Sequence, residues 1–172
     1  MTHPVRPILF ALALLAPALA APLTPAWAAS LANSDKQFLT DDAQGANYEL
    51  ALAKLAQQKA TRAEVKSYAD RLVSDHTTEN AALEKLMAAK GVSPSTGLKA
   101  QDQSRLSQMS SQSGAMFDTA FVNEAVRINA KDKKSSAAEK SSTSDADIKG
   151  LLSQFASMDS GHEKAALALQ GK

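Results

Sequence analysis

The chain of 172 residues contains no cysteine. The fold therefore uses no disulfide, and the chain has no cysteine that could carry a lipoprotein anchor. Aromatic residues make up only 5% of the sequence, and glycine and proline are few. Residues that favour strands are scarce, whereas alanine, which favours helices, is abundant. Together with helical periodicity after about residue 33, this composition predicts an all-α protein.

The chain also has no large excess of positive or negative charge. The formal net charge is +1, and Arg6 is the one charged residue in residues 1–28. The remaining chain therefore carries 18 basic and 18 acidic residues. Nucleic acid binding needs a basic face, and attraction to anionic lipid needs an excess of positive charge. The balance argues against nucleic acid as a partner and offers no general attraction to a lipid surface.

Residues 1–28 have the pattern of a signal peptide. Arg6 supplies the positive start, and the apolar stretch over residues 8–21 is too short for a comfortable membrane span. Two motifs with small residues, suited to cleavage by a signal peptidase, end at Ala20 and at Ala28. We favour cleavage after Ala28. An uncleaved membrane anchor is the alternative to a cleaved signal.

Cleavage at this point would leave a mature chain with a short tail over residues 29–33 and one bundle domain over residues 34–170. No segment after the signal peptide is apolar enough to span a bilayer, so we expect a periplasmic or secreted protein. The sequence identifies no protein partner. It leaves open whether the bundle forms a homo-oligomer by burying a leftover apolar stripe against a second copy.

The mature chain is expected to form four main helices and one short helix. Ser34 with Gln37, and Thr61 with Glu64, have the spacing of capping boxes at the first two helix starts. Gly91 suits the left-handed position that follows the second helix. The predicted helices cover residues 35–60, 61–90, 101–111, 115–131 and 145–170.

The segment over residues 132–144 lacks large apolar residues and is rich in lysine, serine and alanine. The sequence leaves open whether it is a solvated extension of the preceding helix or a mobile linker. Ser144 and Asp147 form a candidate capping pair for the last helix, which starts near Asp145. We find no internal repeat and no domain boundary in the mature chain.

Polar residues interrupt the apolar seam near the middle of each main helix. Residues that alternate at spacings of three and four face the interior of a bundle. An unpaired carboxylate buried there costs several kcal/mol or keeps its proton, so each needs a partner. Single carboxylates lie on the first and third helices, and a carboxylate with a histidine three residues away lies on each of the others: Glu49, His76, Glu79, Glu124, Asp159 and His162.

This set is similar to the ligands of di-iron carboxylate bundles, which take Glu from two helices and Glu-x-x-His from the other two. Here the second helix has the reverse order, and the last helix has Asp in place of Glu. Mixed carboxylate and imidazole ligands suit iron, manganese or zinc. The rival interpretation is a structural polar layer, in which the histidines are hydrogen-bonded core residues and the acids pair with neighbouring groups or turn to the bundle edge.

The mature chain also carries the motifs of a known family. On the predicted helices these are Asp35-x-x-Phe38, Asn47-Tyr48-Glu49-Leu50, Val65-Lys66-Ser67-Tyr68-Ala69-x-x-Leu72-Val73-x-Asp75-His76, Phe117-Asp118-x-x-Phe121-Val122 and His162. Over about residues 34–169 the chain resembles the exported bacterial family catalogued as domain of unknown function 4142. The resemblance implies a ferritin-like four-helix bundle in which Glu49, His76 and His162 face inward.

The chain departs from the pattern of that family at two places. Members usually have a histidine where this chain has Asn129, which is a poorer ligand for transition metals. They also tend to have a Leu-Pro step where this chain has Ser157-Met158.

The sequence lacks the motifs of nucleotide-binding proteins and of serine hydrolases, and it suggests no catalytic residue. We therefore expect an exported, non-catalytic binding or stress-protective protein. The alternative is a bundle that binds iron, manganese or zinc and acts as an oxidase or a metal store, through the six mid-seam residues.

Overall fold

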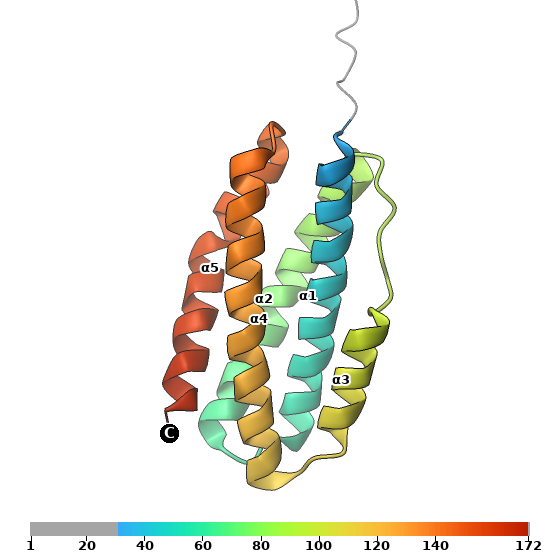
Figure 1. The fold of residues 1–172 in the computed structure, drawn as a ribbon. Helices are drawn as coiled ribbons and strands as arrows, with labels where there is room; N and C mark the ends of the chain where they lie inside the picture. Colours follow the sequence, from blue (N-terminus) through green and yellow to red (C-terminus); the bar gives the residue numbers. More distant parts are fainter. Residues whose placement is uncertain (1–30, 172) are drawn as a thin grey trace, which may run out of the picture. The chain divides into compact units, whose positions relative to one another are not determined.

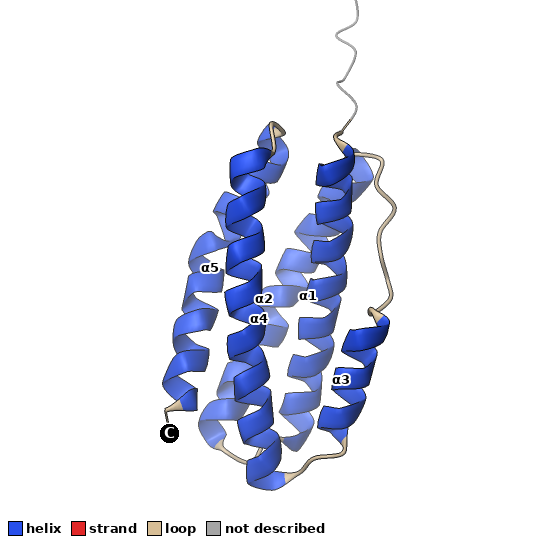
Figure 2. Ribbon diagram, in the orientation of Figure 1, coloured by secondary structure: helices blue, strands red, loops and turns tan. Residues whose placement is uncertain are grey.

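The computed structural model describes residues 31–171, and in this range the chain is built from helices and connecting loops (Figure 2). The predicted signal peptide and its cleavage site lie outside these residues. The helices are α1 (Asn33–Lys59), α2 (Ala63–Ala89), α3 (Ala100–Ser110), α4 (Gly114–Ser142) and α5 (Ala146–Gln170). The predicted all-α fold class, with four main helices and one short helix, is confirmed.

The four long helices form a bundle in which α1 and α2 are antiparallel, α4 and α5 are antiparallel, and α2 and α4 run in the same direction; the short α3 packs outside it (Figure 1). Short connections make each pair of consecutive long helices antiparallel, except between α2 and α4. There the chain returns along the bundle through a loop and α3, which contacts α1 and α4. Among the described helices, none is both long enough and apolar enough to cross a membrane.

The first helix begins two residues earlier than the sequence predicts. Ala32 is the residue before the helix, and Ser34 lies inside its first turn with its hydroxyl donating to Asp35 Oδ1 at 3.3 Å. The predicted capping box of Ser34 and Gln37 is therefore wrong. A side chain caps only from the position that precedes the helix, and alanine occupies that position here.

The start of α2 is capped by a residue from another helix. Asp118, on α4, accepts hydrogen bonds from the backbone N–H groups of Thr61 and Arg62 and from the Thr61 hydroxyl, with the shortest at 2.6 Å. The predicted box of Thr61 and Glu64 is therefore wrong, because Thr61 donates to Asp118 instead of accepting from the helix. Burial alone would raise the pKa of Asp118, but these hydrogen bonds lower it, so the carboxylate is ionised.

Other helix ends are explained by residues close to them in the sequence. Gly91 and Gly114 have φ of 67° and 57°, a left-handed conformation that glycine adopts without strain. Asp145 caps α5 by accepting from the N–H groups of Asp147 and Ile148, so the cap is Asp145 and not the predicted Ser144. The segment that the sequence left open is helical as far as Ser142, which makes it part of α4.

Two apolar clusters fill the bundle, one on either side of a polar layer. The larger cluster includes Phe117 and Phe121, whose rings stack with their centroids 6.2 Å apart. The smaller cluster contains Leu39, Leu83, Met87 and Ile148 from α1, α2 and α5. The C-terminal half of α4 contributes no residue to the smaller cluster, because its side chains after residue 131 are small or polar.

The Asp118 cap generates a prediction about stability. In an Asp118→Ala variant, two partly buried N–H groups and a hydroxyl lose their acceptor, and an unsatisfied polar group costs roughly 1–3 kcal/mol when it is buried. We expect the free energy of unfolding, measured by urea denaturation, to fall by about 2 kcal/mol or more. Asp118→Asn keeps one acceptor oxygen and should lose less. A fall below about 0.5 kcal/mol in the alanine variant would contradict the capping role.

Candidate functional site

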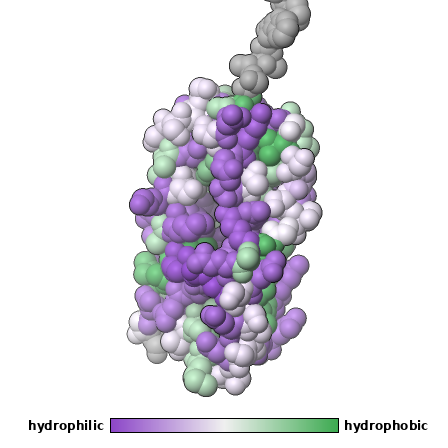
Figure 3. Space-filling model, turned by 45° about the vertical axis from the view of Figure 1, so that its right-hand side comes forward, coloured by the Kyte–Doolittle hydropathy of each residue, from purple (hydrophilic) through white to green (hydrophobic). Residues whose placement is uncertain are grey.

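A polar cavity of about 200 Å³ lies at mid-height between the long helices. On the face that α1 and α4 share, hydrophilic residues surround a recess (Figure 3). A Cβ added to Gly45, in the cavity wall, would meet no atom within 4 Å, so this part of the wall opens on free space. The charged and imidazole side chains that line the cavity are Asp41, Asp42, Glu49, His76, Glu79, Lys99, Lys131, Asp132, Lys133, Asp159 and His162.

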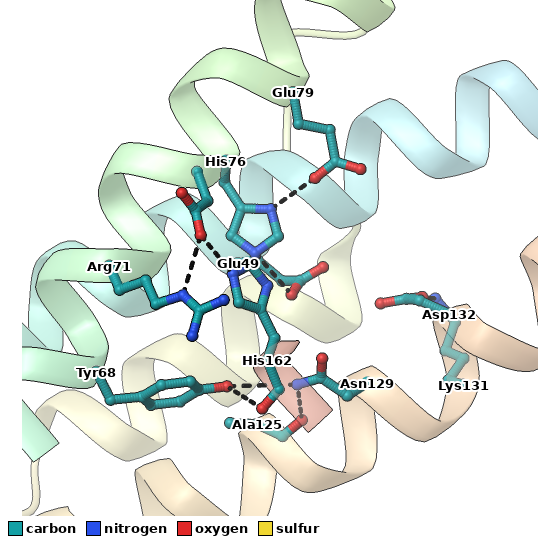
Figure 4. Close-up of polar contacts among 11 residues, drawn as sticks. Glu49, Tyr68, Arg71, His76, Glu79, Ala125, Asn129, Lys131, Asp132 and His162 are labelled. Atoms are coloured by element: carbon teal, nitrogen blue, oxygen red, sulfur yellow. Dashed lines mark hydrogen bonds and ion pairs between the residues drawn. The ribbon is translucent and has the colours of Figure 1, made fainter. Parts of the chain in front are cut away.

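His76 lies between two carboxylates in this cavity (Figure 4). Its Nδ1 is 2.9 Å from Glu79 Oε2, one turn away on α2, and its Nε2 is 3.2 Å from Glu49 Oε2 on α1. The Nδ1 contact is a hydrogen bond. The Nε2 contact is an ion pair without hydrogen-bond alignment, and Nε2 has no other partner among residues 31–171. The His76 side chain is only 4% exposed.

These contacts make His76 a buried imidazolium. Burial alone would lower the pKa of His76, but the negative charge of Glu49 and the contact with Glu79 raise it to about 11. In the same way, burial would raise the pKa of Glu49, but the His76 charge lowers it. The pair is therefore charged on both sides at neutral pH.

Three further carboxylates in the cavity hold their protons unusually tightly. Burial, and then the charges of Glu79 and the other acids, raise the pKa of Asp42 to about 8. Burial and the same acidic surroundings raise the pKa of Asp132 and of Asp159 to about 7. Lys131 pairs with Asp132, whereas Asp42 and Asp159 have no hydrogen-bond or ion-pair partner in the described part of the chain. The cavity thus holds more carboxylates than its own cations neutralise.

His162 completes the imidazole pair. Its ring centroid is 5.2 Å from that of His76, and the side chain is 1% exposed. Burial and the nearby His76 charge lower the pKa of His162, although Asp75 opposes them, so the ring is neutral. The Tyr68 hydroxyl donates to the His162 carbonyl oxygen at 3.3 Å, and the Asn129 amide lies 3.5 Å from that hydroxyl.

The structure brings five of the six predicted site residues to one cavity. Glu49, His76 and Glu79 are in direct contact, and Asp159 and His162 lie in the same wall. The two histidines therefore face each other across the bundle interior, as the sequence interpretation required.

Glu124 is the exception, because the structure does not bring it to the cavity. Its carboxylate accepts from the Tyr48 hydroxyl at 2.9 Å and pairs with Arg127 at 2.6 Å and with Arg105 of α3 at 3.4 Å. The seam of α4 is set by Phe121, Ala125 and Ile128, which turn Glu124 toward α1 and α3. The residue ties the short helix to the bundle and does not line the cavity.

Sequence reasoning missed four acids at or behind the cavity, one of which is Asp41, which pairs with Lys99. Asp42 lies at an inward-facing position but is not part of a recognisable ligand motif. Asp132 lies in the segment for which the sequence left open a linker. Asp75 adjoins His76 in the sequence, yet it contacts His162 at 2.8 Å. Spacing along the chain could have indicated Asp42; the positions of Asp132 and Asp75 depend on how neighbouring helices are rotated.

The negative charge of the cavity carboxylates can be neutralised in two ways. The carboxylates can keep protons, or a bound cation can neutralise them. In residues 31–171 no three imidazole or carboxylate groups are already gathered around one point at the distances of a metal site. A cation would therefore have to draw ligands together and compete with the His76 ion pairs.

The raised carboxylate pKa values predict that the cation-free protein becomes less stable as the pH rises. The unfolded chain releases the Asp42 proton near 3.8, whereas the native state keeps it to about 8, so the native state binds more protons in between. The His76 contribution is complete below 6.5 and is lost as the pH approaches about 11. With a chelator present, the free energy of unfolding should fall by at least about 1 kcal/mol between pH 6.5 and 9, since one pKa unit corresponds to about 1.4 kcal/mol.

Matched variants test the source of this slope. Asp42→Asn removes the carboxyl group with the highest pKa in the cavity, so it should reduce the slope and stabilise the protein at pH 8. Asp41→Asn changes the adjacent acid, whose pKa is lowered by its hydrogen bond to Lys99, and should leave the slope intact. Equal slopes for the wild type and Asp42→Asn in urea denaturation would show that the cavity acids do not govern it.

Comparisons with known proteins agree with this fold. No curated protein matches the chain. A crystal structure of a DUF305 fragment from Deinococcus radiodurans is similar in fold, with a TM-score of 0.72 and 13% sequence identity, over 82% of this chain and 97% of that one. The family model of a domain of unknown function, DUF4142, matches residues 20–169. Because this match spans most of the sequence, the chain belongs to the DUF4142 family.

Proposed function

We propose that this protein is a binding protein whose ligand is a divalent cation held in the acidic cavity. The observation that carries the proposal is geometric: side chains of all four long helices place six carboxylates around a cavity of about 200 Å³. Acids on one helix face are usually solvated separately, but these acids converge on one cavity from four helices.

The charge balance supports a cation with two charges. Facing the six carboxylates are three lysines and the imidazolium of His76, while His162 is neutral. Because Lys133 pairs with Glu163, which does not line the cavity, at least two negative charges are uncompensated when every acid is ionised. The raised pKa values of Asp42, Asp132 and Asp159 are the consequence of this excess. A divalent cation would remove it and allow these carboxylates to ionise at neutral pH.

A buried nitrogen supports the same proposal. His76 Nε2 faces the cavity without a hydrogen bond, although buried polar atoms normally have one. Once it has lost its proton, this nitrogen would have a lone pair for a further partner. If a cation took the place of the His76 proton, Glu49 and Glu79 would be free to act as ligands, and binding would release that proton.

The predicted signal peptide would place this binding protein in the periplasm or outside the cell. Mixed carboxylate and imidazole ligands favour manganese, iron or zinc among the cations available there. Storage or buffering of such a metal would be consistent with a protective role under stress.

Calorimetric titration of the chelator-stripped protein with Mn²⁺ at pH 7.5 tests the proposal. We expect one ion per chain and a rise in thermal stability on binding, because the ligand binds the native state. The Asp42→Asn/Asp159→Asn variant removes two of the uncompensated charges and should weaken binding at least about tenfold.

Glu124→Gln is the matched control, because Glu124 is an acid of the same bundle that lies outside the cavity. It should bind Mn²⁺ as the wild type does. Absence of binding by the wild-type protein to Mn²⁺, Zn²⁺ and Ca²⁺ alike would refute the proposal.

A further inference from the structure

The hydrogen bond between Asp75 and His162 lies behind the cavity wall. His162 Nε2 is 2.8 Å from Asp75 Oδ2, and the bond joins α5 to α2. His162 lines the cavity, whereas Asp75 does not. The carboxylate therefore holds the imidazole from outside the cavity.

Asp75 is itself held in place. Arg71 Nε donates to the same Asp75 oxygen at 3.3 Å, one turn earlier on α2. Gly161, the residue before His162, leaves the room that this arginine occupies: a Cβ there would lie 2.6 Å from Arg71 Nη2. The ion pair with Arg71 stabilises the ionised form of this carboxylate.

This arrangement fixes the tautomer of His162. An ionised carboxylate only accepts hydrogen bonds, so the proton of the ring must be on Nε2. The second proton of an imidazolium is disfavoured by the His76 charge, whose ring centroid is 5.2 Å away. Nδ1 of the neutral ring therefore carries a free lone pair. Figure 4 shows this ring beside that of His76, next to the space toward which the Asp132 carboxylate points.

We infer that His162 Nδ1 is a nitrogen ligand of the cavity, oriented by Asp75, and that the bound cation is a first-row transition metal and not Ca²⁺ or Mg²⁺. The inference rests on the proposed function and names its ligand class. A neutral imidazole nitrogen suits transition metals, while Ca²⁺ and Mg²⁺ take oxygen ligands. Metal-bound histidines almost always donate their other N–H to a carboxylate, a carbonyl or water, as His162 does to Asp75.

His162 is better prepared for this role than His76. Both nitrogens of His76 lie within 3.2 Å of a carboxylate, and its imidazolium must lose a proton before it can bind a metal. His162 needs no such change. Asp75 is a positioning residue, because it acts on the cation only through His162.

Two measurements on the chelator-stripped full chain test the inference. The first compares the affinities for Zn²⁺ and Ca²⁺ by calorimetry, and we expect Zn²⁺ to bind at least tenfold more tightly. The second follows the ring nitrogens of ¹⁵N-labelled histidine by NMR during Zn²⁺ titration, and the Nδ1 resonance of His162 should shift to the range of a metal-bound nitrogen while Nε2 keeps its proton.

Two variants separate ligation from a structural bond between α2 and α5. His162→Gln keeps an N–H donor for Asp75 but has no ring nitrogen; it should lose at least tenfold in Zn²⁺ affinity and leave Ca²⁺ affinity within about threefold. Asp75→Asn can present an N–H to the ring and reverse its tautomer, so Zn²⁺ affinity should fall about 10- to 100-fold, the usual effect of such outer partners. His162→Ala, which removes both functions, shows by its unfolding curve what the bond alone contributes to stability.

The outcomes distinguish this inference from the proposed function. If Ca²⁺ and Zn²⁺ bind equally well, or if His162→Gln binds Zn²⁺ as the wild type does, His162 is not a ligand, although the cavity still binds cations. If no cation binds to the wild type, both proposals fail. An Nδ1 resonance that stays unchanged in the zinc-saturated protein also overturns the inference.

Discussion

The ion pairs of His76 with Glu49 and Glu79 are the interaction on which the rest of the site depends. A bundle interior excludes water, and a charge in it must be paired or neutralised. The single charge of the His76 imidazolium offsets only part of the charge of the two carboxylates it contacts, and Asp42, Asp132 and Asp159 add further acidic groups to the same cavity. Burial and this imbalance together raise the pKa values of Asp42, Asp132 and Asp159.

The bundle accommodates this charge by dividing its apolar core. One cluster surrounds Phe117 and Phe121, the other surrounds Leu39 and Met87, and the acidic cavity lies between them. The C-terminal half of α4 has no large apolar side chain to close the gap, so it forms a polar wall and contributes Asp132. Apolar packing is therefore supplied mainly by the two clusters, and hydrogen bonds such as those of Asp118 join the helices.

The outer partners of the histidines have different roles. The Asp75 carboxylate, held by Arg71, orients His162 and fixes its tautomer. Tyr68 and Asn129 form a second support, since the Tyr68 hydroxyl donates to the His162 carbonyl oxygen. Asn129 also donates to the Ala125 carbonyl oxygen at 2.8 Å, so its amide is engaged within its own helix. At a position where the family pattern has a histidine, this chain has a structural residue.

The sequence by itself determined the all-α fold, the approximate helix ranges and five of the residues that meet in the cavity, because helical periodicity fixes which side of each helix faces inward. Only the tertiary structure decided the partners. Glu124 lies a fraction of a turn from the α4 seam, and the positions of Phe121 and Ile128 turn it toward Arg127 and Tyr48. Likewise, Asp118 caps a helix 56 residues away in the chain, which no local capping pattern reveals. Spacing along one helix carries no information on the rotation and height of its neighbours, and these depend on how all the side chains pack together.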